Sequence, residues 1–336
     1  MRRQALIGWE YCSNSIILFM RICIGVITRD RPQMLKELLE SFAEMNLPEE
    51  TEIGYAVVEN ADSKSLDQVI TAALPGAEVY YENESRRGIP FARNRVVEIG
   101  LRNGYDLTAF VDDDEKVDPD WLEQIVLELQ ARDLDLVGGP IEIQELNCSL
   151  TIMQRIIWHN LFRRFKRVAR RAEKHHREGK DYKVAIVTGN WLIRNSFLIR
   201  TGLRFDESLG VSGGSDVQFY REACRHGAKT GWAPKAMVKE KTPPERLSIS
   251  YQYRRGRDQA ISSYRIKNKK VTPRVVLNSI SFSFVKLVSA LVLWIFVLPT
   301  LGKTLTDSVR SFGFAVGRIK ALLGHKSTQY KSVQGN

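Results

Sequence analysis

Short apolar runs alternate with amphipathic segments along the first third of the chain. The β-branched run Ile22–Ile27 has the length of a buried strand, and similar runs at Glu52–Val58, Glu78–Glu82 and Thr108–Val111 predict three more. Between the first two runs, apolar residues recur at helical spacing over Met34–Phe42. Strands and helices that alternate at this spacing predict βαβ units, and therefore a mostly parallel α/β sheet with helices on both faces.

Further helices are predicted where the sequence contains start signals. Pro32 suits the first turn of the helix over Met34–Phe42, and Leu66–Leu74 reads as a polar helix. Gly88–Gly100 is interpreted as a loop that leads into a helix. The segment Asp118–Trp121 predicts another helix, with an aspartate as N-cap and a proline in the first turn.

Three of the predicted strands end abruptly in polar residues. These polar breaks are Thr28–Arg31, Glu59–Asp62 and Asp112–Glu115. Because ligands of open parallel sheets bind beyond the carboxyl ends of the strands, we expect the three breaks to belong to one site.

The break at Asp112–Glu115 consists of four consecutive acids after an apolar strand. Their mutual repulsion is relieved if a divalent cation lies among them, and hard oxygen ligands suit Mg²⁺ or Mn²⁺ with phosphate oxygens in the remaining positions. The alternative is an exposed acidic turn that caps the next helix. The neighbouring polar breaks favour the metal interpretation.

A glycine followed by cations marks a second candidate. Gly88 allows a close backbone approach, and Arg87, Arg93 and Arg95 lie within nine residues. A helix that starts here would point its first N–H groups towards an anion. An ordinary loop with surface arginines is the alternative.

A single acid follows two glycines further along the chain. In Gly213-Gly214-Ser215-Asp216, the aspartate lies at the start of an amphipathic helix. A carboxylate in this position can act as a general base towards an acceptor hydroxyl, or it can simply cap the helix.

Charge is unevenly distributed. Lys and Arg number 50 against 39 Asp and Glu, a formal charge of +11, and the excess is dense at 154–183 and 254–274, beside apolar stretches. Such an excess favours phosphates, an anionic membrane or nucleic acid. The absence of an aromatic-interleaved RNA motif disfavours nucleic acid. The segment 154–171 is predicted to be a basic amphipathic helix that meets lipid, with a solvated surface helix as the alternative.

The last third contains a long apolar stretch. Ile280–Leu301 reaches spanning length, with Lys286 placed so that its ammonium could snorkel. The upstream flank is the more basic one, which favours a cytosolic catalytic domain. A spanning helix, an interfacial helix and a core helix all remain open, and Phe312–Leu323 predicts another amphipathic helix.

Two remaining features concern the cysteines and the first residues. Cys12, Cys23, Cys148 and Cys224 form no CxxC pair, which favours reduced thiols in a cytosolic compartment. Met20 directly precedes the first predicted strand. Our hypothesis is that translation naturally starts at Met20 and that residues 1–19 are an extension.

These pieces, in this order, resemble the inverting GT-A glycosyltransferases of family 2 over about residues 21–260. The similar motifs are the first strand with Thr28–Pro32, the second strand end at Glu59-Asn60, the DxD motif of Asp112 and Asp114, the segment Gly213–Asp216, and the Gln/Arg-rich segment Tyr251–Gly256. The sequence departs from the family pattern at Glu59 (usually Asp), Ser215 (usually an acid), Glu240 (often a His ligand) and in the Gln/Arg-rich segment, which lacks the Trp.

The resemblance implies a role for each matching residue. Asp216 would be the catalytic base, and Asp112 and Asp114 would hold Mg²⁺ or Mn²⁺. The donor would be held by Thr28, Arg29, Arg31, Glu59, Asn60, Arg93, Asp112 and Asp113. The acceptor side would include Gly213, Gly214, Gln252, Arg254 and Arg255.

The turn Pro243–Arg246, the apolar segment and a glycine-rich tail with Tyr330 resemble bacterial exopolysaccharide glycosyltransferases of the succinoglycan type. This resemblance implies inverting transfer of a hexose, glucose from a UDP-sugar, to a lipid-linked oligosaccharide at the cytosolic face of the bacterial inner membrane. The expected organisation is an extension (1–20), a GT-A domain (21–260) and a membrane-associated helical tail (261–336), with membrane lipid and no nucleic acid as partner.

Two rival interpretations remain. A catalytically inactive nucleotide-sugar-binding or scaffold protein of a polysaccharide assembly complex would share the fold. Such a protein could lose the catalytic base, whereas Asp216 is present in this sequence. A nucleotidyltransferase normally shows a glycine-rich loop in the first turn, and Thr28–Pro32 contains no glycine.

Overall fold

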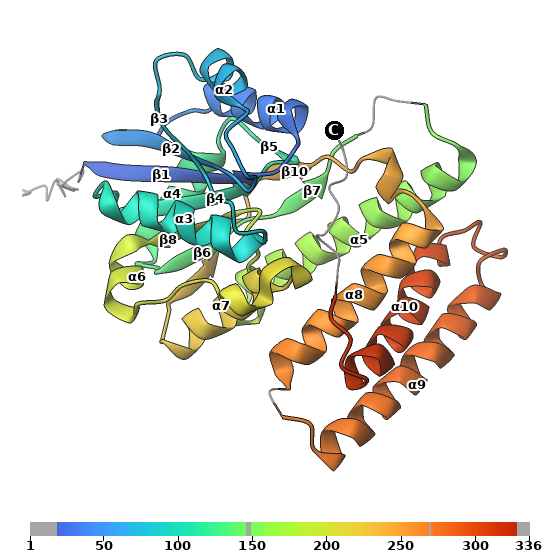
Figure 1. Ribbon diagram of the computed structural model, residues 1–336. Helices are drawn as coiled ribbons and strands as arrows, with labels where there is room; N and C mark the ends of the chain where they lie inside the picture. Colours follow the sequence, from blue (N-terminus) through green and yellow to red (C-terminus); the bar gives the residue numbers. More distant parts are fainter. Residues whose placement is uncertain (1–18, 146–148, 269, 328–336) are drawn as a thin grey trace, which may run out of the picture.

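The computed structural model describes residues 19–145, 149–268 and 270–327, and it shows an α/β unit joined to a group of long helices (Figure 1). The central sheet has the strand order β3-β2-β1-β4-β8-β6-β9. The strand bounds are β1 Met20–Thr28, β2 Thr51–Glu59, β3 Glu78–Asn83, β4 Leu107–Asp112, β6 Leu136–Gly138, β8 Trp191–Arg194 and β9 Thr230–Trp232.

Most neighbouring strands of this sheet are parallel. Strands β3, β2, β1 and β4 are parallel throughout, and β6 is parallel to β9. Strand β8 is antiparallel to both β4 and β6, which the sequence pattern did not predict. The predicted mostly parallel α/β sheet is therefore confirmed, with one inserted antiparallel strand.

Helices cover both faces of the sheet, as predicted. Buried residues of α1, α2 and α4 form one core with the sheet, and those of α3, α6 and α7 form another on the opposite face. The helix bounds are α1 Pro32–Ala43, α2 Asp67–Ala73, α3 Ile89–Arg102, α4 Trp121–Ala131, α6 Asn195–Thr201 and α7 Ser215–Arg225. Pro119 precedes α4 rather than lying in its first turn, and the N-cap residue Asp120 makes no side-chain capping bond.

Strand β1 shows why the first apolar run is continuous. Ile22, Ile24 and Val26 pack into the core formed with α1 and α4, whereas Cys23 packs towards α3 on the other side. All four side chains are fully buried. A strand that is covered on both faces has no solvent-facing positions, and so it lacks polar alternation.

A small second sheet lies beside the end of β4. It consists of β5 (Glu115–Val117), β10 (Val238–Glu240) and β7 (Ile141–Ile143), with β10 in the middle. The antiparallel register of β5 and β10 sets Glu240 opposite Glu115. Residues 240 and 241 are thereby brought to the acidic turn from more than a hundred positions away.

The remaining long helices lie together on one side of the α/β unit (Figure 1). They are α5 (Ile152–Arg177), α8 (Ile249–Lys267), α9 (Pro273–Ile295) and α10 (Leu305–Leu322). Helix α10 contacts both α8 and α9 over its length. Residue 260, the predicted domain boundary, lies inside α8, and the boundary itself stays a prediction.

Glycines bring α8 and α10 into close contact. A Cβ at Gly256 would lie 2.5 Å from the carbonyl oxygen of Arg310, and one at Gly317 would lie 2.2 Å from that of Arg257. The backbones can approach this closely because neither glycine has a side chain. Close packing therefore accounts for Gly256 of α8 and Gly317 of α10.

Helix α9 is the one helix in the described ranges that is long and apolar enough to cross a membrane. Much of its apolar surface is exposed, including Phe284, Leu291 and Trp294. The predicted amphipathic helix is found as α5, which begins with a capping box at Thr151. Ile157 and Leu161 of its apolar face are buried in a protein core rather than free to meet lipid, and contact of its basic face with lipid stays a prediction. Cys23 and Cys224 have free thiols. The other two cysteines, Cys12 and Cys148, lie outside the described residues, as do Tyr330 and the predicted extension up to residue 18.

Candidate active site

The acidic turn lies where β4 ends and β5 begins. The backbone N–H of Asp112 donates to the Glu115 carboxylate at 2.9 Å, which closes the turn. The Thr28 hydroxyl, at the end of β1, donates to Asp113 at 2.8 Å. Arg31 donates to the other Asp113 oxygen at 2.7 Å. The polar residues that end β1 and β4 therefore lie together at one sheet edge.

Arginines from three separate segments surround this turn. Arg93 of α3 lies 3.2 Å from Asp112, and Arg31 lies 3.5 Å from Asp114. Arg246, in the 3₁₀ helix η3 (Pro244–Arg246), approaches Asp114 to 2.9 Å. The turn is not the exposed acidic cap that the sequence left open, because Asp113 and Glu115 are only 6% and 3% exposed.

Negative charge nevertheless exceeds positive charge at this turn. The group contains five carboxylates, which belong to Asp112, Asp113, Asp114, Glu115 and Glu240, whereas three arginines form ion pairs with them. A divalent cation among these carboxylates would offset part of their negative charge. Carboxylate oxygens are also the hard ligands that Mg²⁺ and Mn²⁺ prefer, so the residues present fit such an ion.

The protonation equilibria reflect this crowding. Burial, followed by the charge of Asp114, raises the pKa of Asp113 to about 6 against the opposing effect of Arg31. Burial and the carboxylates of Asp112 and Asp114 raise the pKa of Glu115 well above its ordinary value. Desolvation and Asp114 likewise raise the pKa of Glu240 to about 7. Each shift reflects burial of the carboxyl group first and the neighbouring carboxylates second.

A ready-made group of three ligands lies elsewhere in the described ranges. Glu128, His176 and Asp181 place their ligand atoms within 4.8 Å of one another. Arg132 already pairs with both carboxylates of that group, which offsets part of their negative charge. This group contains none of the predicted metal ligands and lies outside the acidic turn.

Arg93 connects the acidic turn to the start of α7. One of its terminal nitrogens faces Asp112, and the other donates to the Ser215 hydroxyl at 3.2 Å. The side chain is 5% exposed and lies over the ring of Phe205. Ser215 thus receives a hydrogen bond from the arginine that also contacts the acidic turn.

Asp216 lies in the first turn of α7, half-buried. The helix N-cap is Gly214, and no side chain makes a capping bond, so the interpretation of Asp216 as a cap is wrong. Gly213 and Gly214 have φ angles of 78° and 89°, a region that favours glycine. Partial desolvation and the nearby carboxylates of Asp114 and Asp216 raise the pKa of Asp112, which places Asp216 in the electrostatic range of the turn.

The residues at the end of β2 are engaged in hydrogen bonds within the protein. The Glu59 carboxylate, 1% exposed, accepts from Ser65 and from the Tyr81 hydroxyl. The Asn60 amide donates to the carbonyls of Glu84 and Arg86 at 2.8 and 2.9 Å, and its oxygen accepts from the Gly88 N–H at 2.9 Å. Asn60 therefore fixes the start of α3.

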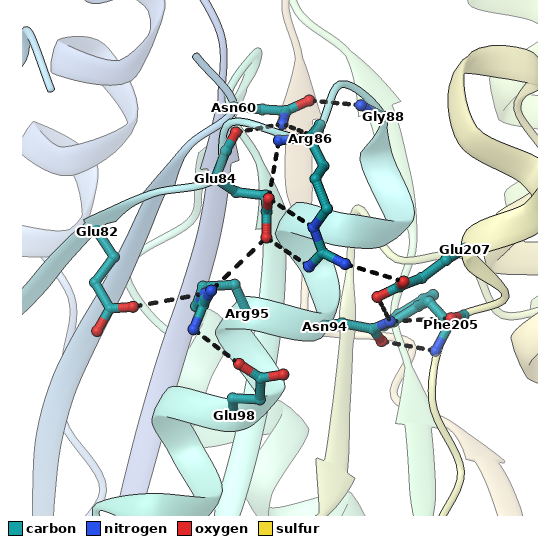
Figure 2. Close-up of polar contacts among 10 residues, drawn as sticks. All are labelled: Asn60, Glu82, Glu84, Arg86, Gly88, Asn94, Arg95, Glu98, Phe205 and Glu207. Carbon is teal, nitrogen blue, oxygen red and sulfur yellow. Dashed lines mark hydrogen bonds and ion pairs between the residues drawn. The ribbon is translucent and has the colours of Figure 1, made fainter. Parts of the chain in front are cut away.

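Figure 2 shows the polar network around this start. Arg86 forms ion pairs with Glu84 and Glu207, and Arg95 points to the acids of β3 and α3. Gly88 has φ 144°, and a Cβ there would lie 2.9 Å from the backbone of Gly210, in the loop before Asp216. The close approach predicted for Gly88 is made to this loop.

The predicted acceptor-side residues differ in their surroundings. Gln252 is buried and donates to the Arg246 carbonyl at 2.7 Å. Arg255 lines a pocket beside Glu240, whereas Arg254 is exposed. Arg29 lies 3.6 Å from Asp30. Sequence reasoning missed Arg246, since the signal at Pro243–Arg246 was only a proline-rich turn.

Most of the chain that forms this sheet matches a family of known proteins. The family described as "Glycosyl transferase family 2" matches residues 23–198, which are more than half of the chain. The protein belongs to glycosyl transferase family 2, and it is a glycosyltransferase.

The chain is also similar to individual proteins. It is 29% identical over 238 residues to the succinoglycan biosynthesis protein ExoM of Rhizobium meliloti (strain 1021), covering 70% of this chain and 72% of that protein. The mannosyltransferase PcManGT from Pyrobaculum calidifontis, solved with GDP-Man and Mn²⁺, superposes with a TM-score of 0.59 at 16% identity, covering 92% of this chain and 89% of that chain. This likeness shows a shared GT-A-like fold.

S. aureus TarS is a more distant structural match. A structure of TarS 1-349 with UDP gives a TM-score of 0.48 at 15% identity, covering 91% of this chain and 92% of that one. Against a longer TarS chain, the match spans 70% of this chain but 38% of that one.

Proposed function

We propose that this protein transfers a hexose, glucose from a UDP-sugar, to a lipid-linked oligosaccharide with inversion, in the biosynthesis of an exopolysaccharide or cell-surface polysaccharide. Family membership and the similarity to a succinoglycan biosynthesis protein support this proposal. The PcManGT structure with GDP-Man supports a nucleotide-sugar donor for a chain of this fold.

In this proposal Asp216 removes the proton from the acceptor hydroxyl as that oxygen attacks the anomeric carbon. General bases of this kind contribute on the order of 100- to 10,000-fold to the rate. The carboxylate is half-buried in the first turn of α7 and does not cap the helix, so it can face a substrate. Single displacement by the acceptor inverts the anomeric centre.

The donor would lie against the acidic turn. Asp112 and Asp114 would hold Mg²⁺ or Mn²⁺, and Glu240 is the third carboxylate at hand. When bound, the ion supplies positive charge against the leaving nucleoside diphosphate. Thr28 and Arg31 hold Asp113 in place, and Arg29 is assigned to the nucleotide. Glu59 and Asn60 would act by shaping the nucleotide pocket, because their side chains already bond to the protein.

The single observation that supports this assignment most is the Arg93 bridge. Arg93 contacts Asp112 of the turn and Ser215, the residue next to Asp216. One side chain therefore sets the spacing between the predicted metal ligands and the predicted base. Such preorganisation is what displacement chemistry requires.

The test uses membranes that contain wild-type protein or Asp216→Asn, with a panel of radiolabelled nucleotide sugars, with and without EDTA. We expect EDTA-sensitive label in a lipid-extractable product from one donor, and a loss of at least 100-fold in the variant with donor binding retained. The control is Glu222→Gln on the same helix, an acid that pairs with Arg225. Transfer by Asp216→Asn at the control rate would refute the assignment, and binding without transfer by wild type would favour an inactive scaffold.

We further propose that the protein sits on the cytosolic face of the bacterial inner membrane with α9 in the plane of the lipid interface. Two serine hydroxyls join α9 to α10: Ser283 donates to the Ala315 carbonyl, and Ser308 donates to the Ala290 carbonyl. A spanning α9 would carry Arg310 and Arg318 of α10 into hydrocarbon at high cost. An in-plane α9 instead buries its exposed apolar side in lipid, and basic α5 supplies attraction to anionic headgroups.

A further inference from the structure

A pocket of about 190 Å³ lies where the helical group meets the α/β unit. Four arginines line it: Arg164 from α5, Arg246 from η3, Arg255 from α8 and Arg310 from α10. Among its described lining residues, Glu240 is the one carboxylate. The pocket is therefore strongly cationic, and Arg164 and Arg310 lie outside the motifs that resemble those of family 2.

Arg310 is poorly compensated in this pocket. Its Nε is buried and has no hydrogen-bond partner in the described part of the chain. Burial, followed by the like charges of Arg164 and Arg255, lowers the pKa of Arg310 to about 10. Within the described residues, the ion pair of Arg164 is a long one, 3.9 Å to Asp307. The charges of Arg164 and Arg310 are therefore weakly offset in this pocket.

Such an arrangement is unfavourable for folding alone. Like charges held together repel, and a buried guanidinium nitrogen without a partner loses the hydrogen bond that it makes in water. Buried polar groups are normally paired, so an unpaired one often marks the position of a missing ligand. Guanidinium groups match the oxygens of phosphates in both geometry and charge.

The pocket lies next to the acidic turn. Arg246 lines it and also reaches Asp114 at 2.9 Å, and Glu240 belongs to both places. A single water needs about 10–15 Å³ on a comparable volume measure, so the pocket has ample room for a phosphate or diphosphate.

We propose that this pocket, through Arg164 and Arg310, binds a phosphate or diphosphate group of one of the two substrates. The inference rests on the proposed function and deepens it. The group could come from the nucleoside diphosphate of the donor or from the diphosphate of a lipid-linked acceptor. Helix α10, which carries Arg310, also packs against α9, the helix proposed to lie in the lipid interface, and this places the pocket in the same helical group as the proposed membrane surface.

The experiment measures binding to the purified full chain, with Mn²⁺ present, by calorimetry. The probes are UDP and farnesyl diphosphate, and the variants are Arg310→Gln and Arg164→Gln. Arg171→Gln, an exposed arginine on α5, is the matched control. Loss of a charge-assisted contact should weaken binding of one probe on the order of tenfold or more. The control should change neither affinity by more than about twofold.

The outcome identifies the source of the anion. Weaker farnesyl diphosphate binding with unchanged UDP binding assigns the pocket to the acceptor, and the reverse pattern assigns it to the donor. Unchanged binding of both probes by both variants would overturn the proposal. Because burial and two like charges disfavour the charged form of Arg310, Arg310→Gln should melt no lower than wild type. If Arg310→Gln does melt lower, Arg164→Gln provides the same binding test. Binding needs no turnover, so a failed transfer assay leaves this result interpretable.

Discussion

Replacing Arg246 by glutamine tests whether positive charge must compensate the acidic turn. Arg246 and Asp114 lie 2.9 Å apart, and their side chains are 16% and 11% exposed. Removing one partner of a buried ion pair costs about 3–5 kcal/mol. Arg31 also approaches Asp114, at 3.5 Å, so part of the compensation remains and the expected loss is about 2–3 kcal/mol.

The assay is thermal unfolding of the full chain with EDTA and with millimolar Mn²⁺. At about 2–4 °C per kcal/mol, the Arg246→Gln variant should melt about 4–12 °C below wild type in EDTA. Without Arg246 the turn has a larger excess of negative charge, so a divalent cation should bind it more tightly and stabilise the variant more than wild type. The gap between the two proteins should therefore narrow in Mn²⁺.

Arg225→Gln serves as the control, since it breaks an exposed pair with Glu222 that is worth less than about 1 kcal/mol. An equal gap in EDTA and in Mn²⁺ would show that Asp114 lies outside the field of the metal. No gap in EDTA would show that Arg246 does not compensate the turn. Either result would refute the reasoning about charge at this site.

Three further outcomes follow from packing and exposure. Gly317→Val sets a Cβ 2.2 Å from a backbone oxygen of α8 and should cost about 1–3 kcal/mol in urea unfolding; unchanged stability would contradict the close packing. Asn60→Ala removes three hydrogen bonds to backbone and should cost about 2–4 kcal/mol by the same measurement, with a loss below 1 kcal/mol arguing against its positioning role. Trp294→Glu, on the exposed side of α9, should reduce sedimentation with phosphatidylglycerol vesicles at least about tenfold, whereas exposed Ile199→Glu on α6 should not; equal retention would contradict the lipid-facing role.

The main sheet and its helices could be predicted from the sequence because their signals are local. The β-branched run of β1 and the helical spacing of α1 lie within single segments, and the structure extends each by only a few residues. The polar residues that end β1 and β4 were also predictable as neighbours, because parallel strands end at one sheet edge. Thr28 and Asp113 meet there.

Contacts between residues that lie far apart in the sequence could not be predicted from local patterns. Strands β5, β7 and β10 have three residues each, too few for any periodicity, so the register of Glu240 with Glu115 left no local signal. Arg246 reaches Asp114 across 132 positions. Arg310 joins Arg164 only because α10 folds back against α5 and α8.

The predicted roles of Glu59 and Asn60 show a different limit. Their positions at the end of β2 were clear, but position does not reveal which partners a side chain will find. The Tyr81 hydroxyl and the Gly88 N–H are brought to them by β3 and α3. Only the packed structure shows that these polar groups are used internally.

Helix α8 connects the proposed membrane surface to the proposed catalytic base. The Ser262 hydroxyl donates to the Ser212 carbonyl at 2.5 Å, and a Cβ at Gly214 would lie 2.7 Å from Ile266. The same helix packs closely against α10, which in turn contacts α9. Helix α8 therefore holds the segment before Asp216 on one side and packs on the other side against α10, which contacts the helix proposed to meet lipid. Docking α9 in the interface would fix the direction in which Asp216 faces relative to the bilayer, and a lipid-linked acceptor needs that fixed direction because its own diphosphate is confined to the headgroup layer.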